Sequence, residues 1–171
     1  AGELGTICVK SPDPVMFLEY WKNPQATEEK FITDANGDRW LDTGDKAIMD
    51  EDDWIFFVGR ADDVINSAGY RIGPAEVENS LLSHPAIASS AVIGIPDEAR
   101  GELVKAFIIL KDGETPSDGL AAEIQNHVKK RLAGHEFPRA VEFVTELPMT
   151  ATGKIQRKVL RERDAAKAAA S

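Results

Sequence analysis

The spacing of hydrophobic and polar residues divides the chain into a β-like first third and a second part in which strand and helix patterns alternate. The first nine residues alternate as a strand does. Segments 46–49 and 54–58 are β-like and flank the polar run 50–53, which predicts a hairpin. Residues 12–38 mix aromatic side chains with a turn signal, Asn36-Gly37, so we expect irregular β structure there.

A short hairpin followed by a helix is expected where the second part begins. Strand-like pieces at 64–65 and 70–72 enclose a turn of small residues. Proline suits the first position of a helix, so Gly73-Pro74 predicts a helix over 74–83.

Two apolar runs rich in β-branched residues follow. Segments 87–95 and 103–110 have the composition of core strands. The polar connection 96–102 is too long for a tight hairpin. We therefore expect two buried strands joined by an extended loop.

The last third predicts two helices around one more strand. An amphipathic helix with apolar residues at every fourth position begins near Ser117, and a basic, then alanine-rich helix covers 157–170. Segment 140–146 is a strand candidate. The order of elements is typical of the α+β class, with a three-stranded core sheet, helices and a short β-hairpin.

Composition excludes several classes of protein. A hydrophobic fraction of 43% among 171 residues is typical of a globular chain, and a formal net charge of -9 opposes a general nucleic-acid binder. No apolar run is long enough to span a membrane and no secretory leader is seen, so we expect a cytoplasmic protein. The single cysteine, Cys8, cannot form an internal disulfide, and the three histidines lack metal-ligand spacing.

Three charged residues on turns could contact a nucleotide. An ionised carboxylate such as Asp45 has two acceptor oxygens for ribose hydroxyls, although turn aspartates are common. Arg60 offers a planar set of donors, with a surface ion pair as the alternative. Lys154, on the loop Thr152-Gly153-Lys154, is a mobile point charge that a phosphate or carboxylate could recruit, with a solvated surface lysine as the alternative.

Four motifs occur in a fixed order along the chain. They are Thr43-Gly44-Asp45, Gly59-Arg60-Ala61-Asp62-Asp63, the segment 67–78 (SAGYRIGPAEVE), and Thr152-Gly153-Lys154-Ile155-Gln156-Arg157. Together they resemble the carboxyl-terminal part of the adenylate-forming superfamily, which includes acyl-CoA synthetases, peptide-synthetase adenylation domains and luciferases. Within this superfamily the residues of the motifs are most similar to those of the medium-chain acyl-CoA and acetyl-CoA synthetases.

The resemblance implies a domain organisation. Residues 1–60 would be the β-rich end of a larger amino-terminal adenylation domain, 61–63 a hinge that contains Asp62, and 64–171 a mobile carboxyl-terminal lid domain. Because the chain begins without methionine in a strand-like run, we expect a fragment of a longer protein.

The resemblance also implies roles for particular residues. Lys154 would be the catalytic lysine of adenylation. Contacts to ATP or AMP would come from Asp45, Arg60 and Arg71. Contacts to coenzyme A would come from Ala68, Gly69, Tyr70 and Arg100, with the Gly69 loop lining the tunnel through which the thiol enters.

The expected reaction has two steps, in which an acid and ATP give an acyl-adenylate and pyrophosphate, and coenzyme A then displaces AMP. A phosphate-binding loop, an acyl pocket and Mg²⁺ ligands are not found in this chain and would lie upstream, so we expect the chain alone to be inactive. Its partners would be the carboxylic acid, ATP, CoA and the amino-terminal domain, and a homo-oligomer is possible. Two alternatives stay open, transfer to a carrier-protein thiol and a stand-alone, non-catalytic binding module.

Overall fold

The chain divides into two compact units between Asp62 and Asp63, in a computed structural model that describes residues 1–170. We describe each unit by itself. The hinge expected at 61–63 spans this boundary, and its motion remains a prediction.

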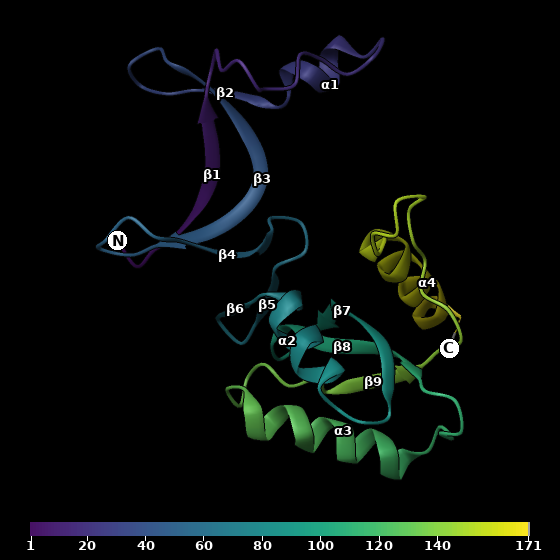
Figure 1. Cartoon of the computed structure of the whole chain (residues 1–171). Helices are drawn as coiled ribbons and strands as arrows, with labels where there is room; N and C mark the ends of the chain where they lie inside the picture. The colour runs from purple at the N-terminus through teal and green to yellow at the C-terminus, as the bar shows by residue number, and fades with distance from the viewer. Residues whose placement is uncertain (171) are drawn as a thin grey trace. The chain divides into compact units, whose positions relative to one another are not determined.

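The first unit is an antiparallel sheet built on one long strand, with a short helix at its end (Figure 1). The elements are β1 (Leu4–Lys10), α1 (Pro24–Glu28), β2 (Phe31–Thr33), β3 (Arg39–Met49) and β4 (Ile55–Arg60). Strands β1, β2 and β4 each pair with β3. The predicted hairpin is therefore confirmed as β3 and β4.

The helix α1 corrects the expectation of irregular β structure over 12–38. The Asn23 side chain accepts a hydrogen bond from the backbone N–H of Ala26, and Pro24 follows at the first helical position. Both features favour a helix start. The aromatic composition of this segment concealed them.

The first unit buries few apolar side chains. Ala47 is the one hydrophobic residue among 1–62 that is fully buried. Trp54, Ile55, Phe56 and Phe57, at and next to β4, are all more than half exposed. Exposed apolar residues close together are typical of interaction or ligand-binding surfaces.

The second unit holds a five-stranded sheet in the order β6-β5-β8-β7, with β9 paired to β8. The strands are β5 (Ile65–Ser67), β6 (Tyr70–Ile72), β7 (Ile87–Asp97), β8 (Gly101–Leu110) and β9 (Ala140–Phe143). All pairs are antiparallel except β8 with β9. The α+β class is confirmed, and the short hairpin β5–β6 is joined to the core sheet through the pair Ser67 and Gly101.

Three helices cover the two faces of this sheet (Figure 1). They are α2 (Pro74–Leu82), α3 (Asp118–Arg131) and α4 (Arg157–Ala169). On one face α2 and α3 pack against Val92 and Val104, and on the other α4 packs through Leu160 against Phe107. Successive side chains of β7 and β8 point to opposite faces of the sheet. Because helices cover both faces, apolar residues occur at nearly every position of the two strands.

The connection between β7 and β8 is shorter than the sequence suggested. The strands continue to Asp97 and Gly101, which leaves only residues 98–100 between them. The Asp97 carboxylate accepts hydrogen bonds from the N–H groups of Ala99 and Arg100, and Gly101 takes a φ of 77°. These features close a tight turn, so the prediction of an extended loop was wrong.

Candidate functional site

Asp45 and Arg60 face each other across the β3–β4 ladder. They are register partners, and Arg60 Nη1 donates to Asp45 Oδ1 at 3.0 Å and to the Thr43 carbonyl at 2.8 Å. A Cβ on Gly44, where φ is 75°, would lie 2.7 Å from Arg60 Nη2. Gly44 and Asp45 lie within β3, so the turn expected there from the sequence is not found, and the missing Cβ at Gly44 gives the guanidinium room to approach the strand and bind the carboxylate.

The guanidinium of Arg60 carries a stable positive charge. Burial lowers its pKa, but the hydrogen bond that Arg60 donates to Asp45 and the negative charges of Asp62 and Asp45 outweigh burial, so the pKa is raised. Asp62 lies 3.5 Å away, measured from its Oδ1 to Arg60 Nε. The structure thus brings together three of the residues chosen from the sequence, with Arg60 paired to both carboxylates.

Ala68 and Gly69 form the two-residue turn between β5 and β6. Both have positive φ, 52° and 84°, and Ser67 pairs with Tyr70 across the turn. Two successive positive φ values define the turn type that matches the twist of a hairpin. A Cβ on Gly69 would meet nothing within 4 Å, so this corner of the backbone is open.

Arg100 lies next to this turn through its backbone. The N–H of Ala68 donates to the Arg100 carbonyl at 2.8 Å. The Tyr70 ring stacks on His135, with ring centroids 3.7 Å apart and planes 12° apart. The four residues expected to contact coenzyme A are therefore gathered at one edge of the sheet, together with His135, which sequence reasoning missed. Arg71 follows on β6 with an exposed side chain.

Lys154 lies on a small hydrogen-bonded loop before α4. Thr150 N–H donates to the Lys154 carbonyl at 2.8 Å, and Lys154 N–H donates to Thr150 Oγ1 at 3.0 Å. Gly153, with φ 79°, makes the corner, and Met149 and Ile155 form an antiparallel bridge. The backbone is thus fixed, while within residues 1–170 the exposed ammonium has no hydrogen bond or ion pair.

A partly buried ion cluster follows this loop, and sequence reasoning missed it. Arg157 donates from Nη2 to both carboxylate oxygens of Glu78, at 2.9 and 2.7 Å, and from Nη1 to Asp63 at 3.2 Å. Arg161 donates to the other oxygen of Asp63 at 3.0 Å. A cation in the first turn opposes the helix dipole, so Arg157 at the start of α4 was the signal that could have revealed a partner.

A second ion cluster joins the far part of α4 to the sheet. Lys105 on β8 pairs with Glu142 at 2.9 Å and with Asp164, and Glu142 also pairs with Lys167. Burial alone raises the pKa of Glu142, but hydrogen bonds from Lys167 and Lys105 outweigh it and the pKa is lowered. These ion pairs link α4 to β8 and β9, so we interpret the cluster as structural.

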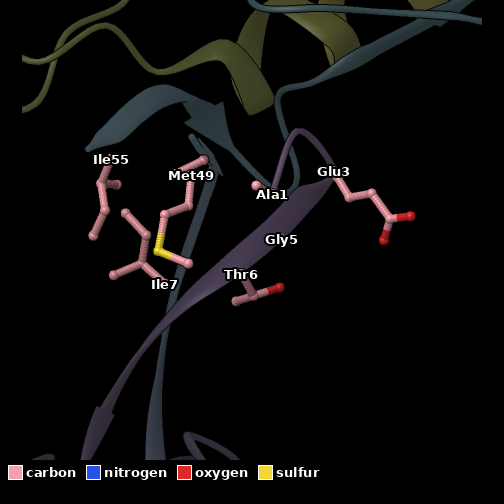
Figure 2. Close-up of a pocket in the computed structure, with 8 residues that line it drawn as sticks. Ala1, Glu3, Gly5, Thr6, Ile7, Met49 and Ile55 are labelled. Atoms are coloured by element: carbon pink, nitrogen blue, oxygen red, sulfur yellow. The ribbon is translucent and has the colours of Figure 1, made fainter. Parts of the chain in front are cut away.

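The first unit also has an apolar hollow of about 270 Å³ beside β1 and β4. Figure 2 shows Ile7, Met49 and Ile55 turned toward one another at its side, with Glu3 pointing away. Lysine, arginine and histidine are absent from its lining. The hollow is therefore unsuited to bind a phosphate.

Residues 1–170 contain neither a cluster of metal ligands nor a membrane-spanning helix. No group of three or more histidine, cysteine, aspartate or glutamate side chains there could hold a metal ion. No helix within the same range has the length and hydrophobicity needed to cross a membrane.

Comparisons with known proteins agree with this geometry. Residues 76–154 match the family described as "AMP-binding enzyme C-terminal domain". The chain is 49% identical over 161 residues to a mitochondrial acyl-coenzyme A synthetase, ACSM1, of Mus musculus, and 47% identical over 158 residues to an acetyl-coenzyme A synthetase of Bacillus subtilis. Each match covers 92% of this chain and 27% of the relative.

A solved structure extends the likeness to nearly the whole chain. The anthranilate CoA ligase AuaEII, in complex with anthranoyl-AMP, is similar with a TM-score of 0.79 and 44% identity. The match covers 99% of this chain and 31% of that chain. The chain thus spans less than a third of the length of the proteins that it matches.

Proposed function

We propose that this chain works as the carboxyl-terminal part of an ATP-dependent acid-CoA ligase, because residues 76–154 match the AMP-binding enzyme C-terminal domain and the chain is similar to acyl-CoA and acetyl-CoA synthetases. The ligase joins an acid to AMP with release of pyrophosphate and then transfers the acyl group to the thiol of coenzyme A. This chain supplies the lysine of the first step and a loop for the second.

The observation that carries the proposal is the Lys154 loop. A rigid backbone presents a cation that has no partner within residues 1–170. When a carboxylate attacks the α-phosphate of ATP, two anions must approach each other and charge builds on the phosphoryl group. An ammonium between them lowers this barrier and aligns the reacting atoms.

The Asp45–Arg60 pair supports nucleotide binding by the first unit. The two bonds from Arg60 hold the carboxylate and the Thr43 carbonyl in fixed positions. The carboxylate then offers acceptors for the hydroxyls of a ribose. Arg71, on the second unit, is proposed to meet the phosphates in the adenylation state.

The Ala68–Gly69 turn supports the thiol-transfer step. Its open corner gives a pantetheine chain room to pass close to the backbone. Tyr70 and Arg100 lie at the same edge, and Arg100 is proposed to meet a phosphate of coenzyme A.

The larger protein is expected to supply what these residues lack. Mg²⁺ and the acyl group are assigned to an amino-terminal domain, against which the exposed apolar residues at β4 would pack. A hinge at Asp62 would let the second unit turn from one half-reaction to the other. A cytoplasmic location remains the prediction.

Acid-dependent ATP–pyrophosphate exchange by the full-length protein tests the proposal. We expect exchange with at least one member of a panel of carboxylic acids, and thioester formation when CoA is added. Exchange without CoA acylation, together with acylation of a pantetheine-loaded carrier protein, would assign transfer to a carrier. Absence of exchange with every acid would contradict a ligase function.

A further inference from the structure

Two neighbouring carboxylates at the unit boundary are held by different units. Asp62 is 3.5 Å from Arg60 of the first unit. Asp63 accepts hydrogen bonds from Arg157 and Arg161 of the second unit. Asp62 is thus paired within the first unit and Asp63 within the second, and the peptide link between these two residues joins the units.

The anchor of Asp63 is the stronger of the two. The Asp63 side chain is 13% exposed, against 69% for Asp62, so water screens its ion pairs much less. Arg157 donates hydrogen bonds to both carboxylate oxygens of Glu78. Glu78 also accepts a hydrogen bond from the Val92 N–H at 2.8 Å. Asp63 is therefore tied to α4, α2 and β7 together.

The same cluster reaches the Lys154 loop. Arg157 follows Lys154 by three residues, and the intervening Gln156 donates from its backbone N–H to the Pro148 carbonyl at 2.8 Å. Movement of the chain at Asp63 is thereby coupled to the loop through short, hydrogen-bonded segments. A rigid connection of this kind turns a rotation at one point into a defined displacement of a distant side chain.

We propose that Asp63 is a positioning residue, which confines the pivot between the units to the Asp62–Asp63 link and makes the Lys154 loop move as one body with the second unit. Its role in catalysis rests on the function proposed above, whereas its role as an anchor does not. Without the anchor, the residues after Asp63 gain backbone freedom, and Lys154 samples a wider range of positions.

Asp63→Asn tests the proposal, with Asp164→Asn as the matched control. Each carboxylate forms an ion pair that links α4 to another part of the second unit, and the two are similarly exposed, at 13% and 12%, but Asp164 pairs with Lys105 away from the boundary. In the full-length protein we expect Asp63→Asn to lower kcat for ATP–pyrophosphate exchange about 10-fold, with KM for ATP unchanged. Asp164→Asn is expected to leave kcat unchanged below its melting temperature.

A distance measurement separates the anchor from the catalytic role. Cys8→Ser removes the cysteine of this chain, and Thr33→Cys on β2 and Ala122→Cys on α3 each carry a spin label. Electron spin resonance then measures the spread of distances between the two labels, one on each unit. Asp63→Asn should widen this spread and Asp164→Asn should not. If Lys154→Ala leaves exchange intact while the spread still widens, the proposed function fails and the anchor stands.

Equal spreads in the two variants would overturn the proposal, as would an equal loss of kcat. If Asp63→Asn does not fold, Arg161→Gln replaces it, because this change removes one of the two partners of Asp63 at a more exposed position. An unchanged spread in a folded Arg161→Gln protein would equally refute the anchor.

Discussion

Gly69 and its neighbour Ala68 show how one turn serves the proposed thiol-transfer step. The left-handed backbone at both positions makes the hairpin possible, and the missing Cβ at Gly69 leaves its corner open. A side chain at this corner would project into open space and block an approaching pantetheine chain. It would leave the Lys154 loop untouched.

Gly69→Leu is expected to reduce thioester formation about 10-fold or more while ATP–pyrophosphate exchange stays near normal. The left-handed φ also costs a leucine about 1–2 kcal/mol of stability. Gly113→Leu is the control, because Gly113 has a φ of 90° and nothing within 4 Å of its Cβ position but lies outside the site. Both half-reactions are measured in the full-length protein, and equal effects of the two variants would refute the role of Gly69.

Residue types on turns could be read from the sequence, but their partners could not. Asp45, Arg60 and Lys154 were found through the short motifs that contain them, although the structure places Asp45 and Arg60 on strands β3 and β4 and only Lys154 on a loop. Glu78 and Asp63 precede Arg157 by 79 and 94 residues, so only the fold brings these three together. The stacking of His135 on Tyr70 likewise depends on a loop whose path no local pattern determines.

The packing of α3 on α2 provides a test at the level of elements. A hollow of about 510 Å³ beside the two helices is lined by His84, Glu123, Asn126, His127, Lys130 and Arg131. Ser83 Oγ lies 2.8 Å from His127 Nε2, and the rings of His84 and His127 meet edge to face. Burial, then His84 and Arg131, lower the pKa of His127, against smaller opposite effects of Ser80 and Glu123.

The α2–α3 contact should weaken as the solution becomes acidic. Because the pKa of His127 is lower in the folded chain than its ordinary value of 6.5, the unfolded chain takes up a proton first as pH falls. The stabilisation is present above about pH 6.5 and is lost below it. Protection factors of the α3 amides should therefore be constant above about pH 6.5 and drop as the pH falls below it. His127→Gln should show a smaller drop, and an identical drop would contradict this assignment.

The elements with a strong period were predictable, and the short connections were not. The strands from 87 and 103 and the helix from Ser117 are confirmed within a few residues. Their buried positions require apolar residues at regular spacing, and this spacing is visible in the sequence. The connection after residue 95 was predicted to be too long because its residues are polar. In the structure Pro96, Asp97, Gly101 and Glu102 continue the pairing of the two strands, and Asp97 and Gly101 make a short turn possible. The helix α1 was missed since its five residues carry no period.

Two units of different character make up the whole molecule. The second unit has a core on each face of its sheet. The first buries only Ala47 among its hydrophobic residues and exposes several aromatic ones. This contrast agrees with a lid that folds around its own core and a β-rich segment that packs on a larger domain. We therefore expect the proposed chemistry to need the full-length protein, in which Lys154 would meet its substrate.

The most direct test of this account is the effect of Lys154→Ala on the two half-reactions of the full-length protein. We expect ATP–pyrophosphate exchange to fall about 10²- to 10³-fold, while thioester formation from a supplied acyl-adenylate and CoA is retained. Lys158→Ala, which removes an exposed lysine from the next turn, should leave both rates unchanged. Unaltered exchange by Lys154→Ala would contradict the central claim.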